Sequence, residues 1–185
     1  MMEQISRNWP SSFPVIHTQR YTLRALNELD LPELVIRCNH YDISKQTSSL
    51  PYPYTLNFAI GRLKLIQDGF TNMSRLVWVI EDNSTKNLVG EIGLHWREAS
   101  QSVEVGYWIG VDFWGMGIAT ECLRAVLNFA SEFKIARFVF GTHFADNPAS
   151  GRTMEKAGMI SEGEVEPVLN QEGELKRLCR FKLDL

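Results

Sequence analysis

The sequence predicts one mixed α/β domain, with a central twisted mixed sheet of about six to seven strands and about four helices beside it. Two observations lead to this prediction. Residues 103–119 pass from a strand pattern through two glycines into an amphipathic helix, and a β-rich run follows at residues 137–142. A strand, a helix and a strand in this order form a βαβ unit with parallel strands. Before and after this unit, apolar residues alternate as in antiparallel hairpins.

Composition limits the classes of function. A chain of 185 residues corresponds to one domain, assigned here to residues 1–185 with a loose lead-in at 1–14. The apolar fraction is 44% and the charged fraction 22%, as in ordinary soluble proteins. The net charge of −3 argues against nucleic-acid or membrane-surface partners, and no apolar run reaches the roughly 18 residues of a membrane span.

The three cysteines are far apart and have no metal-ligand spacing. Together with the absence of a secretory signal pattern, this predicts a cytoplasmic protein without a metal. The thiols are expected to be small buried hydrophobic groups. The oligomeric state stays open between monomer and homodimer.

The N-terminal part predicts a strand at residues 17–26 and a helix at 27–40, with Asp30 as its cap and Pro32 in its first turn. A proline-punctuated loop at 48–55 leads into a second helix at 55–68. Its inward-facing positions are Phe58, Ala59, Leu63 and Ile66. This loop and helix could line an acceptor cleft or could be ordinary surface packing.

A hairpin follows, with strands at residues 75–81 and 87–96 and a turn at 82–85. Period-two alternation puts Glu91, Gly93 and His95 on one face of the second strand. The next strand carries Val103, Val105, Tyr107 and Ile109 on one side.

The later helices have clear signals. Apolar residues recur with helical spacing from Ile118 onward, so this helix buries one stripe. The last helix is expected to begin at Asn147 as N-cap with Pro148 next, and to end at Gly158. Two strands at 159–165 and 176–183, joined by a turn at 170–173, complete the predicted sheet.

Gly115 and Gly117 lie between the strand and the helix of the βαβ unit. Backbone N–H groups of such a turn, together with the helix dipole, bind anions, and glycine lets a phosphate approach closely. The alternative is a tight turn that only leads into a packed helix.

Two stretches together carry a family resemblance. One is Glu-Val-Gly-Tyr-Trp-Ile at 104–109 with Trp-Gly-Met-Gly-Ile-Ala-Thr-Glu at 114–121, and the other is Asp-Asn-Pro-Ala-Ser at 146–150 with Glu-Lys-Ala-Gly-Met at 155–159. The chain resembles the GNAT superfamily of acyl-CoA-dependent N-acetyltransferases over residues 17–183. More narrowly, it resembles the branch of ribosomal-protein N-terminal (alanine/serine) acetyltransferases, on residues 18–24, 50–54 and 89–93 as well.

The resemblance implies a GNAT fold whose parallel strands splay apart at an acetyl-CoA site. The pyrophosphate would lie on the glycine turn, and the pantetheine arm would run beside the strand at 103–109. Gly106 is expected to form a bulge that opens the gap, or else to be a packing glycine. Asp112 stands where the family usually has Arg or Gln. The implied cofactor-binding residues are Trp108, Ile109, Val111, Gly115, Met116, Gly117, Ile118, Ala119, Asn147 and Ser150.

The same resemblance suggests catalytic roles. Ser150 would donate a proton to the departing thiolate, and the backbone N–H near Ile109 would stabilise the oxyanion. Glu104 is the first candidate for a general base, with Glu91 and His95 as alternatives. For Glu104, Ser150 and Asn147, a purely structural role stays open, as a held carboxylate, a helix-start residue and a helix cap.

The predicted function is therefore acetyl transfer from acetyl-CoA to a primary amine in a ternary complex, without metal. The acceptor could be a protein N-terminus or a small amine such as a polyamine or antibiotic, and a non-catalytic acyl-CoA sensor is a further alternative. The final hairpin lacks the Asp and Tyr common in the ribosomal branch, which argues against a ribosomal substrate.

Overall fold

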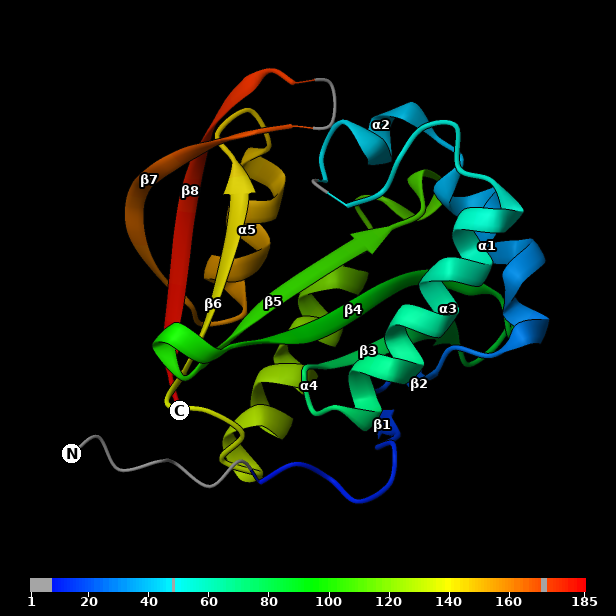
Figure 1. The fold of residues 1–185 in the computed structure, drawn as a ribbon, viewed down its shortest axis with the longest axis horizontal. Coiled ribbons are helices and arrows are strands. Elements are labelled where there is room, and N and C mark those ends of the chain that lie inside the picture. The colour runs from blue at the N-terminus through cyan, green and yellow to red at the C-terminus, as the bar shows by residue number, and fades with distance from the viewer. Residues whose placement is uncertain (1–7, 48, 171–172) are drawn as a thin grey trace.

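The computed structural model describes residues 8–47, 49–170 and 173–185, which form an eight-stranded mixed sheet with helices on both faces (Figure 1). The strand order is β1-β2-β3-β4-β5-β6-β8-β7. The strands are β1 (Ile16–His17), β2 (Tyr21–Ala25), β3 (Arg75–Asp82), β4 (Leu88–Arg97), β5 (Ser102–Ile109), β6 (Phe138–Phe144), β7 (Ile160–Leu169) and β8 (Leu175–Asp184). The α-helices are α1 (Leu31–Cys38), α2 (Tyr41–Ser44), α3 (Leu56–Thr71), α4 (Ile118–Glu132) and α5 (Pro148–Lys156). Three 3₁₀ turns are η1 (Glu28–Asp30), η2 (Glu98–Ser100) and η3 (Val111–Phe113).

The mixed α/β architecture is confirmed, and the eighth strand comes from a break in the first predicted strand. The chain reverses at residues 18–20, where the backbone N–H and the hydroxyl of Thr18 both donate to the Tyr21 carbonyl. β1 therefore pairs antiparallel with β2 instead of continuing it.

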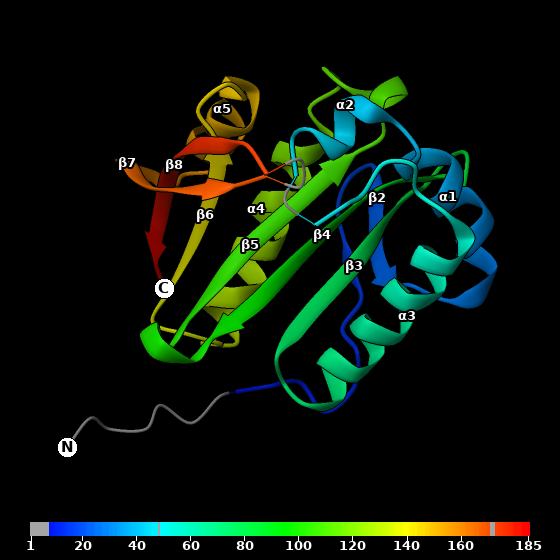
Figure 2. The same ribbon diagram turned by 45° about the horizontal axis from the view of Figure 1, so that its top comes forward.

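β3 shows why the sheet needs helices on both faces. Leu76, Trp78 and Ile80 belong to one buried cluster, and Val77 and Val79 belong to another. The first cluster lies under α4, while the second lies under α1 and α3, on the opposite face (Figures 1 and 2). A strand buried on both faces is apolar throughout instead of alternating.

The beginning of α1 corrects one sequence prediction. The Asp30 carboxylate makes no cap bond to α1; it accepts from the Asn27 backbone N–H at 2.9 Å and from Arg24 at 2.8 Å. Asn27 is the capping residue, because its side chain accepts from the Leu29 N–H at the start of η1. The carboxylate is held by the arginine across the first turn and cannot also bind the amides of α1.

Phe58 is also placed differently from the prediction. Ala59, Leu63 and Ile66 are buried under α3 as expected, but Phe58 is 53% exposed. One residue before Ala59 lies about 100° around the helix, which turns Phe58 off the buried face. Its ring lies at the edge of the helix, 6.3 Å from the ring of Tyr54.

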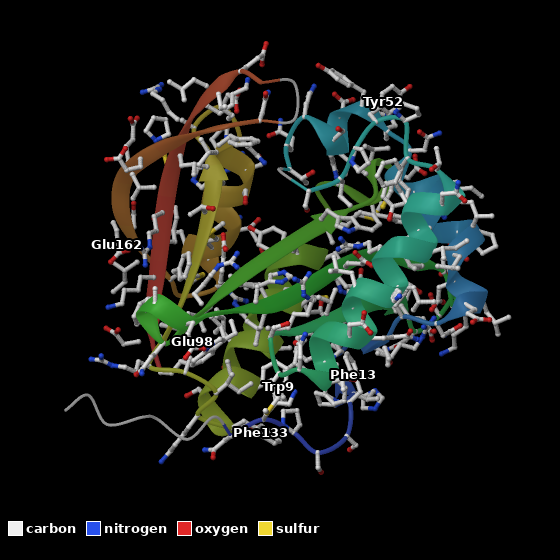
Figure 3. All side chains as sticks on the ribbon, in the orientation of Figure 1. Trp9, Phe13, Tyr52, Glu98, Phe133 and Glu162 are labelled. Carbon is white, nitrogen blue, oxygen red and sulfur yellow. The ribbon has the colours of Figure 1, made fainter. Side chains whose placement is uncertain are left out.

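Part of the predicted lead-in is anchored to the domain. Trp9 donates from its indole to the Phe70 carbonyl at 3.1 Å, and the Phe13 ring lies 5.3 Å from that of Phe70. Figure 3 shows Trp9 and Phe13 at one end of the molecule, with Tyr52 at the other. Residues 1–7 lie outside the described part of the chain.

The other predicted elements are confirmed with small changes at their ends. Asn147 caps α5, and Gly158 follows the helix with φ of +96°. Cys38 and Cys122 are buried, as expected of small hydrophobic groups, whereas Cys179 is half-buried. Of the predicted turn at 170–173, residues 171 and 172 are not described. Within the described ranges, no helix has both the length and the apolarity to cross a membrane.

Candidate functional site

The parallel strands β5 and β6 separate soon after they begin. Their register pairs only Val103 with Val139 and Glu104 with Phe140, although the strands continue to Ile109 and Phe144. The two arrows diverge from their common start in Figure 1. From Val105 onward, the β5 edge that faces β6 therefore has no strand partner in the described chain.

The hydrogen-bond pattern shows which groups of β5 face this gap. The Gly110 N–H donates to the Val89 carbonyl of β4 at 2.9 Å. Because N–H directions alternate along a strand, the N–H groups of Ile109 and Tyr107 point away from β4 and into the gap. Two free donors on an extended strand are suited to pair with an amide-containing ligand laid beside it.

The predicted bulge at Gly106 is wrong. Gly106 lies opposite Gly93 in an unbroken register with β4, so the gap arises on the β6 side alone. A side-chain carbon at Gly106 would meet nothing closer than His95 Nε2 at 3.8 Å, so close packing does not require the glycine either. Gly106 and Gly93 carry no side chains of their own, and the His95 imidazole and, beside Gly93, the Val77 side chain lie next to them.

The glycine turn has the geometry of an anion site. Gly115 and Gly117 have φ of +79° and +75°, where a side chain is disfavoured. Gly117 is the N-cap of α4 and supplies no capping side chain. The first intrahelical bond is from the Glu121 N–H to the Gly117 carbonyl, and the preceding N–H groups of Ile118 and the next two residues have no partner in the described chain. A helix N-terminus with unused donors attracts negative charge.

Arg20 contacts this turn from the loop between β1 and β2, far away in the sequence. Its Nε donates to Glu121 at 2.8 Å, and its Nη1 donates to the Met116 carbonyl at 3.1 Å. A side-chain carbon at Gly117 would lie 3.7 Å from Arg20 Nη2. The ion pair keeps the Glu121 carboxylate from capping α4, and it brings a guanidinium beside the turn.

Asp112, the departure from the family pattern, has a partner as well. Arg37 donates to its carboxylate at 3.0 Å and stacks on the Phe113 ring, 4.8 Å from its centroid. Arg37 thus compensates part of the Asp112 charge, because the same guanidinium also pairs with Glu33 at 3.2 Å.

A cleft of about 1050 Å³ joins the turn, the gap and the space beneath α3. Most of the predicted cofactor residues line it, namely Trp108, Ile109, Gly115, Gly117, Ile118, Ala119, Asn147 and Ser150. Val111 and Met116 are not among its lining residues. Val111 packs on the core under α1 and α3, and Met116 is 53% exposed with its carbonyl bound to Arg20.

Trp108 and Glu91 form a buried structural unit. The Trp108 indole donates to Glu91 Oε2 at 2.9 Å, and Arg62 forms an ion pair with the same oxygen at 2.5 Å. Glu91 is only 1% exposed. Both donors hold the carboxylate through Oε2, while Oε1 is buried without a partner among the described residues. The Trp108 indole N–H is used by Glu91.

Ser150 and Asn147 lie at the start of α5, next to the gap. The Asn147 side-chain oxygen accepts from the Ser150 N–H at 3.3 Å, which confirms the cap and leaves the Asn147 amide N–H₂ free for a ligand. The Ser150 hydroxyl lies 2.9 Å from the hydroxyl of Tyr107. Burial raises the Tyr107 pKa to about 12, so the phenol stays protonated. Its one proton can go to the Ser150 carbonyl at 3.1 Å or to the Ser150 hydroxyl.

Glu104 lies where the two strands part. Arg97 Nε donates to its Oε2 at 2.9 Å, and Thr142 lies 3.5 Å from its Oε1. The carboxylate is 24% exposed in the cleft. This position leaves Oε1 accessible to water or an amine.

His95 lies over Gly93 and Gly106. Its pKa falls to about 3 because of burial and of the nearby charges of Arg75 and Arg97. The imidazole is therefore neutral near pH 7 and a weak base. It can accept or donate a hydrogen bond without carrying charge.

Three arginines near the site have no local sequence signal. Arg75 and Arg97 line the cleft and Arg20 lies beside the glycine turn, and all three come there through strand register and helix docking. Tyr107 also lines the cleft, and alternation along the strand already places it on one side with Ile109. In the described residues, no three His, Cys, Asp or Glu side chains gather as a metal site would require.

Comparison with known proteins adds a family context. Residues 20–160 match the family model described as an acetyltransferase (GNAT) domain. The chain is 28% identical over 163 residues to the uncharacterized N-acetyltransferase YoaA of Bacillus subtilis, covering 87% of this chain and 91% of that protein. It is 29% identical over 105 residues to the ribosomal-protein-serine acetyltransferase of Escherichia coli, covering 56% and 55%.

Among solved structures, the fold is similar to that of RimL, a ribosomal L7/L12 alpha-N-protein acetyltransferase, in complex with coenzyme A. The TM-score is 0.82 at 16% identity, over 93% of this chain and 98% of that one. At such identity the likeness establishes the fold, with its splayed parallel strands, and leaves the acceptor open.

Proposed function

The chain belongs to the GNAT acetyltransferase family, and on this premise we propose that it acetylates the α-amine of a peptide N-terminus by direct transfer from acetyl-CoA. The observation that carries the proposal is the open edge of β5 beside the uncapped start of α4. The β5 edge supplies free N–H groups for the amide carbonyls of a pantetheine arm. The start of α4 supplies free N–H groups for a pyrophosphate.

In this arrangement the pyrophosphate lies on the turn from Gly115 to Ala119, with the Arg20 guanidinium nearby. The pantetheine arm pairs with β5 in the place that β6 leaves open. The arm runs from the turn back along β5, so the thioester lies near Tyr107, whose hydroxyl contacts Ser150. The Tyr107 N–H, and not the Ile109 N–H expected from the sequence, then stabilises the thioester oxygen as negative charge develops there.

The chemistry needs one bond formed and one broken. The amine nitrogen attacks the thioester carbon, and the carbon–sulfur bond breaks. The Ser150 hydroxyl donates its proton to the departing thiolate, and the Tyr107 phenol lies within hydrogen-bonding distance of Ser150. Ser150 regains a proton through solvent, which balances the proton that the amine loses. With a pKa of about 8.5, a thiol needs only modest help to leave.

The proton lost by the amine goes to Glu104, through a water molecule at its Oε1. Of the three candidate bases, Glu91 is enclosed by its own partners, and His95 has a low pKa. A peptide α-amine has a pKa of about 8, so near pH 7 part of it is already neutral, in contrast to a lysine amine.

Two features support a peptide acceptor. A second, apolar pocket of about 230 Å³ adjoins the cleft and shares Ser49, Leu50, Arg62 and Leu65 with it, so that an extended chain could occupy both. The ribosomal-protein acetyltransferases similar to this chain act on proteins by name. The cationic groups beneath α3 do not favour a polyamine, which would be repelled.

The test is calorimetric titration with acetyl-CoA, followed by thiol release against a panel of short peptides, the same peptides with blocked N-termini, and small amines. We expect binding, and release only with free N-termini. Release with small amines alone would refute the peptide acceptor, and binding without release on any acceptor would favour a sensor.

A further inference from the structure

The cleft is cationic in a protein whose net charge is −3. Among the described residues, five cationic and three carboxylate side chains line it. They are Arg62, Arg75, Arg97, Arg152 and Lys156, and Glu91, Glu104 and Asp146. Because coenzyme A is itself an anion, a cationic side chain that binds the acceptor must be distinguished from those that face the cofactor.

Beneath α3, two of the three arginines are already neutralised. Arg62 pairs with Glu91 at 2.5 Å, and Arg97 pairs with Glu104. Arg75 has no carboxylate partner within the described residues, and its buried Nε has no hydrogen-bond partner there. Burial lowers the Arg75 pKa, and the charges of Arg62 and Arg97 lower it further. A partly buried guanidinium without compensation favours an anion.

The position of Arg75 defines where that anion would lie. The register places Arg75, His95 and Glu104 in one row across β3, β4 and β5. Adjacent strands lie about 4.8 Å apart, so the Arg75 backbone is about 10 Å from β5. A side-chain carbon at Gly69 would lie 2.1 Å from Arg75 Cγ. The Arg75 side chain therefore packs against α3 and extends away from β5.

The cleft continues across β4, because Arg75, Gly93, His95 and Gly106 all line it. Gly93 and Gly106 lie opposite each other in the next row and carry no side chains, and the His95 imidazole lies over them. A chain whose amine is at the gap can therefore pass beside His95 toward Arg75. An extended peptide covers about 3.4 Å per residue, so about 10 Å corresponds to the second or third residue.

We propose that Arg75 binds an acidic side chain at the second or third residue of the acceptor peptide. The inference rests on the proposed peptide acetylation and specifies its substrate class. The α-carboxylate of a free amino acid is too close to its amine to bridge this distance, which is why a peptide side chain is the expected anion.

The experiment compares serine-initiated pentapeptides that differ only by Asp or Asn at position 2, and a second pair that differs at position 3. We expect kcat/KM to be about tenfold higher for the Asp peptide of at least one pair, mainly through KM, as for a charge-assisted hydrogen bond. Arg75→Gln should remove the preference, and Arg75→Lys should keep part of it. Arg137→Gln removes an exposed arginine outside the cleft and should leave the preference unchanged.

Binding of the same peptides to the CoA-saturated protein, measured by calorimetry, separates the two proposals. If thiol is released equally from Asp and Asn peptides, the inference fails and the proposed function stands. If the Asp peptide binds more tightly through Arg75 but no acceptor releases thiol, the proposed function fails and the anion site stands. Equal affinities at both positions, no peptide binding, a preference that survives Arg75→Gln, or selectivity for free amino acids over their amides would each overturn the inference.

Discussion

Replacing Gly117 with glutamate tests the anion site at the start of α4. The residue has φ of +75°, and a side chain there points toward Arg20, whose Nη2 is 3.7 Å from the new Cβ position. The new carboxylate would lie beside the N–H groups that we propose bind pyrophosphate.

The substitution should lower both the stability of the fold and the affinity for acetyl-CoA. A side chain in left-handed backbone geometry costs about 1–2 kcal/mol of folding free energy. At about 5 Å and an effective dielectric constant of about 40, each pair of like unit charges costs about 1.7 kcal/mol of binding free energy. Arg20 would compensate part of the new charge, so we expect a net loss of about 2 kcal/mol, or about thirtyfold in the Kd for acetyl-CoA.

The matched control is Gly158→Glu. Gly158 also has a positive φ, of +96°, and a side chain there meets nothing within 4 Å and is outside the cleft. Both variants should lose similar stability in urea unfolding, but only Gly117→Glu should lose acetyl-CoA affinity in calorimetry. Equal affinities for the two folded variants would refute the proposed pyrophosphate site.

Three further predictions concern residues of the cleft. Ser150→Ala should lower kcat about a hundredfold with little change in acetyl-CoA affinity, measured by thiol release and calorimetry; an unchanged kcat would exclude Ser150 as the proton donor. Glu91→Gln should lower the free energy of unfolding by about 3 kcal/mol, because it leaves the Arg62 charge buried without its partner; a loss under about 0.5 kcal/mol in urea unfolding would show that the pair is not structural. His95 is neutral in the fold, with a pKa of about 3 against an ordinary 6.5, so the unfolded chain binds the proton first as the pH falls. The free energy of unfolding should therefore decrease below about pH 6.5 by up to about 1.4 kcal/mol per pH unit. In urea unfolding between pH 6.5 and 4.5, His95→Asn should have a weaker pH dependence than the unmodified protein. The same slope in both proteins would contradict the reasoning.

The environment of Glu104 could be predicted only in part from the sequence. Alternation on the strand predicts which face it occupies, and the βαβ unit predicts that this strand has a parallel neighbour. The sequence does not show where the two strands part, and the bulge expected at Gly106 is absent. The separation depends on how β6 pairs with β8 and how α5 packs, and these are contacts between distant segments.

The sequence by itself determined the local elements: the βαβ unit, the glycine turn with its positive φ angles, and the Asn147 cap. These follow from hydrophobic period and from the backbone preferences of glycine, proline and asparagine, which act over a few residues.

Only the tertiary structure decided which charges meet. Arg20 reaches Glu121 across 101 positions, Arg37 reaches Asp112 across 75, and Arg62 reaches Glu91 across 29. These partners depend on strand register and helix docking, which no local pattern encodes. Among the described residues, the same packing leaves Arg75 without a carboxylate partner and its Nε without a hydrogen bond, and the acceptor inference depends on this uncompensated charge.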